Sequence, residues 1–220
     1  MTTWEEGQRE FEKQMRTEYM LDNLQIYLDE IESVREIYTE VFHLSGKILD
    51  VGGCQGRLRY YLGSDTTEYT SIDPMPFNLH ALEDQPNLLK AYPCLTGPLP
   101  YPCWFFTGVA EDLHLFHNDT FDWIHMRSVV DHFENPMQAF REAYRVCKPG
   151  GHLLVGLAII DKIPTTFRSI IRNFMNPDKH ITRLTVEQLH NLYKETGWKV
   201  EQEHWQKKPF EYCLYSCVVK

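Results

Sequence analysis

The stretch Lys47-Ile-Leu-Asp-Val-Gly-Gly-Cys-Gln-Gly56 decides the fold of this 220-residue chain. Its apolar run ends in a glycine-rich turn, and Arg57-Leu-Arg-Tyr-Tyr-Leu62 then reads as a helix. In a doubly wound α/β sheet, a strand followed by a tight turn of small residues and a helix brings the backbone close to a nucleotide. Gly52 and Gly56 suit positions where a Cβ would collide with a ligand or with the next element.

The acidic residue of this stretch, Asp50, helps to distinguish a dinucleotide-binding turn from other nucleotide-binding turns. Asp50 puts a carboxylate beside the turn, which disfavours a pyrophosphate and favours a cationic or hydroxyl-rich ligand. A dinucleotide-binding turn has the pattern G-x-G-x-x-G, whereas the pattern here is D-x-G-x-x-x-G. A nicotinamide-binding domain is therefore the weaker interpretation. A strand-turn-helix unit without any ligand is a further alternative.

The turn resembles the first motif, D/E-x-G-x-G-x-G, of class I S-adenosylmethionine-dependent methyltransferases, with Cys54 in place of the middle glycine. Three later segments agree with the same family in order. The stretch Gly108–Leu113 resembles its third motif, with Val109 at the position of the first acid. Arg145–Leu153 matches the signature R-V-L-K-P-G-G-x-L with one substitution, and His180–Trp198 resembles the C-terminal part of the family.

The resemblance covers about residues 45–220 as one domain and implies a Rossmann-like α/β fold. This fold is a seven-stranded, mostly parallel sheet with an antiparallel last strand, flanked by helices. Residues 1–44 form a separate N-terminal extension. Within it, between about residues 4 and 43, apolar positions recur close to a 3.6-residue period. This pattern predicts a helix packed on the sheet edge, or a lid over the cofactor with Tyr19 or Tyr27 near the substrate.

Patterns along the rest of the chain predict the other elements. A helix begins at Asn135-Pro136 and ends before Lys148-Pro-Gly-Gly151. A second helix, from Thr185 to Thr196, has a capping box at its start and Gly197 at its end. Residues 163–182 are polar and irregular, where the family usually inserts a segment that covers the substrate. Strands are predicted at residues 69–73, 104–108, 121–126, 152–160, 198–204 and 210–219, the last two as an antiparallel hairpin.

The resemblance implies S-adenosyl-L-methionine as the cofactor and a set of residues that hold it. Asp73 ends the second strand 23 residues after Asp50, where a carboxylate accepts hydrogen bonds from both ribose hydroxyls. An ordinary turn acid before proline is the alternative. The Ala110 backbone and the Glu111 side chain are expected near the adenine. The expected cofactor-binding set is Asp50, Gly52, Gly53, Gly56, Asp73, Ala110, Glu111 and Arg127.

Methyl transfer is an in-line displacement with a neutral leaving group, so the enzyme mainly aligns the reacting atoms and excludes water. A hydroxyl acceptor would need a base, and the imidazole of His132 or of His180 is the candidate. The alternative for His132 is a histidine that caps a helix or packs under the lid. Arg127, at the end of the fourth strand, is expected to bind an acidic substrate group or to pair with a carboxylate.

Composition limits the class of partner. The net charge is −9, with 31 acidic and 22 basic residues and no basic stripe, which argues against nucleic acid as a partner.

The six cysteines contain no C-x-x-C pair, which indicates buried thiols in a reducing compartment. The acidic N-terminus is unlike a signal peptide, and the longest apolar run, Leu153–Ile160, is too short for a bilayer. A cytoplasmic protein without a membrane partner is predicted. His114-x-x-His117 lacks completing ligands, so no metal is expected.

The sequence thus predicts S-adenosylmethionine-dependent methyl transfer to a small-molecule acceptor, at oxygen in the first instance, with nitrogen or carbon open. One alternative is an enzyme of this fold that uses the bound sulfonium for another reaction, for which Cys54 and Val109 leave room. Another is a non-catalytic partner protein, with the N-terminal helix as the surface of a homodimer. Intact Asp50, Gly52 and Asp73 argue against it.

Overall fold

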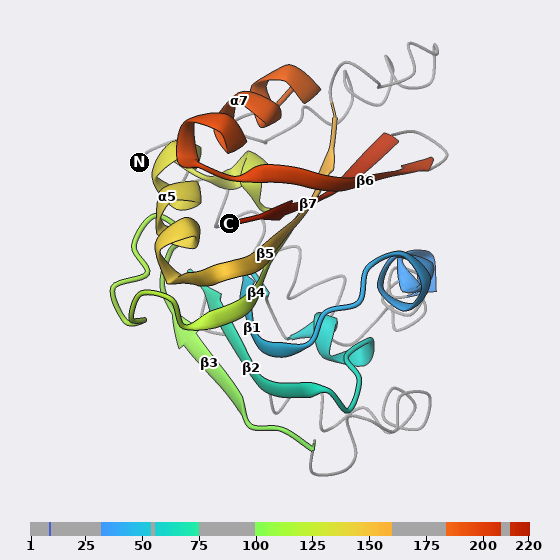
Figure 1. Ribbon diagram of the computed structural model, residues 1–220, viewed down its shortest axis with the longest axis vertical. Helices are drawn as coiled ribbons and strands as arrows, with labels where there is room; N and C mark the ends of the chain where they lie inside the picture. Colours follow the sequence, from blue (N-terminus) through green and yellow to red (C-terminus); the bar gives the residue numbers. More distant parts are fainter. Residues whose placement is uncertain (1–8, 10–31, 54–55, 75–99, 160–183, 208–211) are drawn as a thin grey trace.

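The computed structural model describes residues 9, 32–53, 56–74, 100–159, 184–207 and 212–220. The centre of the molecule is a seven-stranded sheet in the order β3-β2-β1-β4-β5-β7-β6 (Figure 1). Of these strands β7 alone runs antiparallel to its neighbours, which confirms the predicted Rossmann-like α/β sheet. The strands are β1 (Gly46–Val51), β2 (Thr66–Asp73), β3 (Cys103–Thr107), β4 (Phe121–Arg127), β5 (Cys147–Ala158), β6 (Lys199–Lys207) and β7 (Tyr212–Val219).

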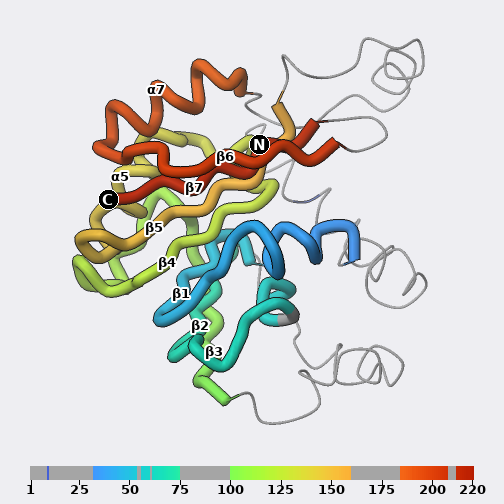
Figure 2. The backbone as a smooth tube through the Cα atoms, turned by 45° about the vertical axis from the view of Figure 1, so that its right-hand side comes forward, coloured from blue at the N-terminus to red at the C-terminus, as the bar shows by residue number. Residues whose placement is uncertain are grey.

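The sheet buries a separate apolar core on each face, because its central strands carry apolar side chains on both sides. Helices α5 (Pro136–Val146) and α7 (Val186–Thr196) cover one face, where Phe140 and Tyr193 are fully buried. The segment that precedes β1 covers the other face and buries Ile37 there. Figures 1 and 2 show this layered arrangement, with the two helices on one side of the sheet and the segment before β1 on the other.

The ends of both helices follow from their sequences. Asn135 precedes α5 and accepts a hydrogen bond from the Gln138 N–H, and Pro136 occupies the first turn, where no N–H is needed. Thr185 and Gln188 form the predicted capping box at the start of α7. Gly197 ends α7 with a positive φ of 93°, as predicted from its position.

Several predicted boundaries differ from those in the structure. The helix predicted over residues 57–62 is present as the shorter 3-10 helix η3 (Arg57–Tyr60). Strand β2 begins three residues earlier than predicted, at Thr66, and β6 ends three residues later, at Lys207. Strand β5 begins at Cys147 and not at His152. Cys147 pairs directly with Phe121 of β4, so the Lys-Pro-Gly-Gly segment joins the sheet across a register shift and does not form a loop.

Of the N-terminal extension, the structure describes residue 9 and the last part, residues 32–44. Residues 32–36 are largely helical and continue into a π-helical turn, η2 (Ile37–Val41), in place of a regular α-helix. The remainder of the helix predicted between residues 4 and 43 lies outside the described residues, as does the predicted substrate-covering segment, residues 163–182. Among the helices that the structure describes, none has the length and apolar character needed to span a membrane.

Candidate functional site

The carboxyl ends of three neighbouring strands form one edge of the sheet. Strand β1 lies between β2 and β4, and Val51 pairs with Ile72 on one side and with Met126 on the other. The chain therefore leaves β1 at Gly52 between the ends of its two neighbours. Ligands of open α/β sheets bind at this edge, outside the carboxyl ends of the strands.

The turn after β1 is held in a shape that requires glycine. Gly52 has a positive φ of 68° and donates its N–H to the Ile72 carbonyl at 2.8 Å, and a Cβ there would collide with the side chain of Val129. A Cβ on Gly53 would lie 2.5 Å from the Ser71 Oγ and 2.6 Å from the Asp50 carboxylate. The backbone thus passes directly over Asp50, with no room for a side chain between them.

A chain of hydrogen bonds lies beneath this turn. The Asp50 carboxylate is 3% exposed. One of its oxygens accepts a hydrogen bond from the Tyr69 hydroxyl at 2.5 Å, and the other lies 2.7 Å from the Nδ1 of His125. The Nε2 of the same imidazole lies 2.7 Å from the Tyr38 hydroxyl. Four side chains from β1, β2, β4 and η2 are therefore joined in one buried network.

The two tyrosines of this network keep their protons. Burial raises the pKa of Tyr38 and of Tyr69 well above the usual value, so both phenols remain protonated. The Tyr38 hydroxyl and the Nε2 of His125 share a hydrogen bond whose donor depends on the tautomer of the ring. The ring of Tyr38 also stacks on Tyr61, with 5.0 Å between ring centroids. Tyr38 therefore connects the N-terminal extension to the polar network beneath the turn.

Asp73 ends β2 beside the turn and is 7% exposed. Its backbone carbonyl accepts the Gly108 N–H at 3.0 Å, which brings the segment after β3 to the same edge of the sheet. In that segment Ala110 is buried, and the Glu111 carboxylate accepts a hydrogen bond from the Asn135 N–H at 3.2 Å. The residues predicted for the ribose and for the adenine are thus adjacent in space.

The segment after β4 supplies the other predicted polar groups. Arg127 is the last residue of β4, and Ser128 follows it with a positive φ of 54°, which is uncommon for a residue other than glycine. The Ser128 N–H donates to the Gly156 carbonyl at 2.7 Å. The 3-10 helix η5 (Val130–His132) comes next, and the His132 side chain is 31% exposed, with its Nε2 4.0 Å from the Asp131 carboxylate. A strained turn therefore redirects the chain at the strand end and leaves an imidazole in contact with solvent.

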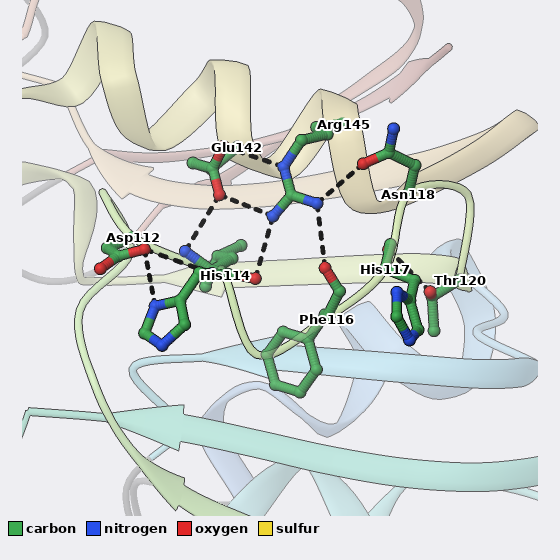
Figure 3. Close-up of polar contacts among 9 residues, drawn as sticks. Asp112, His114, Phe116, His117, Asn118, Thr120, Glu142 and Arg145 are labelled. Atoms are coloured by element: carbon green, nitrogen blue, oxygen red, sulfur yellow. Dashed lines mark hydrogen bonds and ion pairs between the residues drawn. The ribbon is translucent and has the colours of Figure 1, made fainter.

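Arg145, from the most specific sequence match, has a structural role (Figure 3). Its guanidinium forms two hydrogen bonds with the Glu142 carboxylate, at 3.0 and 2.7 Å. It also donates to the carbonyls of Leu113 and Phe116, and Glu142 in return accepts the Leu113 N–H at 3.0 Å. This arrangement fixes the segment between β3 and β4 to α5. His114 lies at its rim, where its Nδ1 is 2.8 Å from Asp112.

The structure brings most of the predicted cofactor residues to one edge of the sheet. Tyr19, Tyr27 and His180 lie outside the described residues. The sequence interpretation missed the buried partners of Asp50, namely Tyr69 and His125, and also Tyr38, which bonds His125. The sequence does point to His125, because a polar residue in an otherwise apolar stretch of a predicted central strand needs a buried hydrogen-bond partner. The predicted cofactor residues that lie at this edge of the sheet are Asp50, Gly52, Gly53, Asp73 and Arg127, and Gly56, Ala110 and Glu111 lie in the adjoining segments.

A family model described as "Methyltransferase domain" matches residues 11–203. The chain belongs to this methyltransferase domain family. The match includes the glycine-rich turn, all the strand ends that form the site, and helix α7. It confirms the resemblance on which the sequence interpretation depends.

Several solved structures, some of them described as methyltransferases, have the same fold as this methyltransferase domain. A protein of Pyrococcus horikoshii has a TM-score of 0.66 at 19% identity, over 94% of this chain and 98% of that one. A Thermotoga maritima protein, described as a SAM-dependent methyltransferase and possible histamine N-methyltransferase, has a TM-score of 0.59 at 18% identity, over 99% and 98% of the two chains. A SAM-dependent methyltransferase of Leishmania major has a TM-score of 0.58 at 18% identity, over 87% and 72%. No curated protein matches the chain.

Proposed function

We propose that this chain is an S-adenosylmethionine-dependent methyltransferase that acts on a small molecule, with an oxygen as the methylated atom. One observation carries the proposal: a glycine turn without room for a Cβ lies over the buried Asp50, beside an acid at the end of β2. A bulky nucleoside ligand needs this close approach of backbone, and its ribose needs the acid. The residues present therefore fit the cofactor.

The cofactor would extend along the strand ends from β4 to β3. The Asp73 carboxylate would accept hydrogen bonds from the ribose hydroxyls, and charge-assisted bonds of this kind are roughly twice as strong as neutral ones. The backbone of Gly52 and Gly53, followed by that of Gly56, would hold the amino acid part of the cofactor. The Ala110 backbone and Glu111 would hold the adenine.

Asp50 supports the turn from below and contributes negative charge to the site. Its two oxygens are held by Tyr69 and His125, so the carboxylate stays fixed while ligands exchange. The carboxylates of Asp50 and Asp73 make the edge of the sheet acidic, which favours a cationic ligand over a pyrophosphate. When bound, S-adenosylmethionine supplies a methyl group on a positively charged sulfur.

The acceptor is expected to enter from the side of η5. His132 ends η5, five residues after the last residue of β4, and its partly exposed imidazole would take the proton of an acceptor hydroxyl. Arg127 would bind an acidic group of the acceptor. Tyr19 and Tyr27 of the N-terminal extension, and His180 as a second base, complete the proposed acceptor site. The cytoplasmic location and the homodimer also remain predictions.

The proposal is tested by incubating the purified protein with S-adenosylmethionine and panels of small phenols, alcohols, carboxylates and amines. Formation of S-adenosylhomocysteine with an oxygen acceptor is expected. His132→Ala should then lower kcat by at least tenfold with a hydroxyl acceptor, since general base catalysis contributes about 10²–10⁴-fold. Turnover only with amines would reject oxygen as the acceptor atom. Cofactor binding without turnover on any panel would favour a reaction of another type.

A further inference from the structure

Three side chains from neighbouring strands meet far from the carboxyl ends of the sheet. They are His152 on β5, Cys217 on β7 and Glu201 on β6. Their ligand atoms all lie within 4.8 Å of one another. His152 precedes Gly156, the partner of Arg127, by four residues, which is about 13 Å along a strand. The cluster is therefore separate from the proposed cofactor site.

We propose that these three side chains form a site for a divalent transition-metal ion of the zinc type. Imidazole nitrogen, thiolate sulfur and carboxylate oxygen are the three ligand types that Zn²⁺ takes from proteins. A hard cation such as Mg²⁺ is disfavoured by the sulfur and the nitrogen. With three protein ligands, the fourth position would be filled by water.

Two of the three distances between ligand atoms lie within a few tenths of an ångström of those in a tetrahedral zinc site, and the third, from His152 to Cys217, is no longer than 4.8 Å. With bonds of about 2.0–2.3 Å, neighbouring ligand atoms of a tetrahedral zinc site lie about 3.3–3.6 Å apart. The Nε2 of His152 lies 3.1 Å from the Glu201 carboxylate, and the Sγ of Cys217 lies 3.8 Å from the same oxygen. That oxygen now accepts a hydrogen bond from the Cys217 thiol and forms an ion-pair contact with the His152 imidazole. A cation would replace these contacts, and the thiol would release its proton to solvent as the metal–sulfur bond forms.

A β-bulge directs Glu201 into the cluster. Val200 pairs with Val218 and Gln202 pairs with Cys217, so Glu201 is an extra residue between two ladder positions. Bulges redirect a side chain and are frequent beside functional sites, although they also protect edge strands such as β6. Here the extra residue places a carboxylate beside the buried Cys217 thiol.

The other two ligands are already held in place. The His152 imidazole stacks on the Trp123 indole, with 4.6 Å between centroids and 19° between planes. Cys217 is 3% exposed and lies in the apolar core, whereas the Glu201 side chain is 55% exposed. The site is thus rigid on the protein side and open to solvent at Glu201, the arrangement needed for a cation to enter.

The test is a metal titration of the full chain after removal of metals with a chelator. We expect one equivalent of Zn²⁺ to bind in competition with a chromophoric chelator, with micromolar or tighter affinity. Co²⁺ in its place should give a sulfur-to-metal charge-transfer band. Cys217→Ser and Glu201→Gln should each weaken Zn²⁺ binding at least tenfold, and Cys217→Ser should remove the band.

Cys213→Ser is the matched control, because Cys213 lies on the same face of β7, four residues away, and is also buried. This variant should retain the affinity and the band of the wild type. Thermal unfolding without metal establishes that each variant is folded. Binding of no Zn²⁺, or equal affinity in the wild type and in folded Cys217→Ser and Glu201→Gln, would overturn the proposal. None of these readouts depends on methyl transfer, so they remain informative if the proposed function fails.

Discussion

The Asp50 carboxylate and the His125 imidazole lie 2.7 Å apart beneath the glycine turn, 75 residues apart in the chain. Both are almost completely buried. The pair joins β1 to β4 side by side, and its outer atoms are held by Tyr69 and Tyr38. The shape of the turn and the position of the N-terminal extension therefore depend on one polar network inside the sheet.

His125→Ala tests this network. The substitution removes a partner from the buried Asp50 carboxylate and from the Tyr38 hydroxyl, and uncompensated buried groups of this kind cost roughly 3 kcal/mol. We expect the free energy of unfolding in urea to fall by that amount. His204→Ala on β6 is the control and should change stability by no more than about 0.5 kcal/mol. Equal effects of the two variants would show that the network is not a stabilising unit.

Gly53→Ala tests the close passage of the turn over Asp50. The added methyl would meet the Ser71 hydroxyl and the Asp50 carboxylate at 2.5–2.6 Å, so the turn must shift. We expect a loss of about 1–3 kcal/mol of stability from this overpacking, and at least tenfold weaker binding of S-adenosylhomocysteine. The control is Gly150→Ala, which has a positive φ of 75°, unlike Gly53, and nothing within 4 Å of the new Cβ. It should lose stability without any loss of binding.

Arg145→Ala tests the clamp on the segment between β3 and β4. The variant removes hydrogen bonds to two backbone carbonyls and leaves the Glu142 carboxylate with only its backbone partner. We expect a destabilisation of roughly 3 kcal/mol in urea unfolding. Arg141→Ala on the exposed side of the same helix should cost less than about 0.5 kcal/mol. A similar cost for both variants would contradict the structural role of Arg145.

The same clamp predicts how stability depends on pH. Hydrogen bonds from Arg145, followed by the Leu113 N–H, hold the pKa of Glu142 below its usual value of 4.5. The folded state thus binds this proton less readily than the unfolded state, so the stabilisation is complete above pH 4.5 and is lost as the pH falls through the folded pKa. Glu142→Gln should therefore lose less stability than the wild type between about pH 7 and about pH 3. Equal losses over that range would reject the linkage.

The order of strands and helices was predictable because each element has a hydrophobic pattern or a cap within its own residues. The capping box at Thr185 and the cap at Gly197 are decided by residues within one helical turn of each other. Boundaries set by distant partners were not predictable in this way. Strand β5 begins at Cys147 because Phe121 of β4 offers a pairing position, and no local feature of the Lys-Pro-Gly-Gly segment shows this.

The candidate site was predicted in part for the same reason. Gly52 and Asp73 are recognisable from their places after two apolar runs. The partners of Asp50 come from β2 and β4, and their approach depends on the strand order β2-β1-β4, which the spacing of residues does not reveal. The proposed zinc site of His152, Glu201 and Cys217 likewise depends on the pairing of β5, β7 and β6 and on the bulge at Glu201. No residue pattern in the sequence predicts that bulge.

The most direct measurement for the central proposal is a calorimetric titration with S-adenosylhomocysteine of the wild type, Asp73→Ala and Asp65→Ala. Asp65 is an exposed acid at the opposite end of β2 and serves as the matched control. The account predicts micromolar or tighter binding to the wild type and to Asp65→Ala, and at least tenfold weaker binding, about 1.4 kcal/mol, to Asp73→Ala. No binding to the wild type, or equal binding to all three proteins, would contradict it.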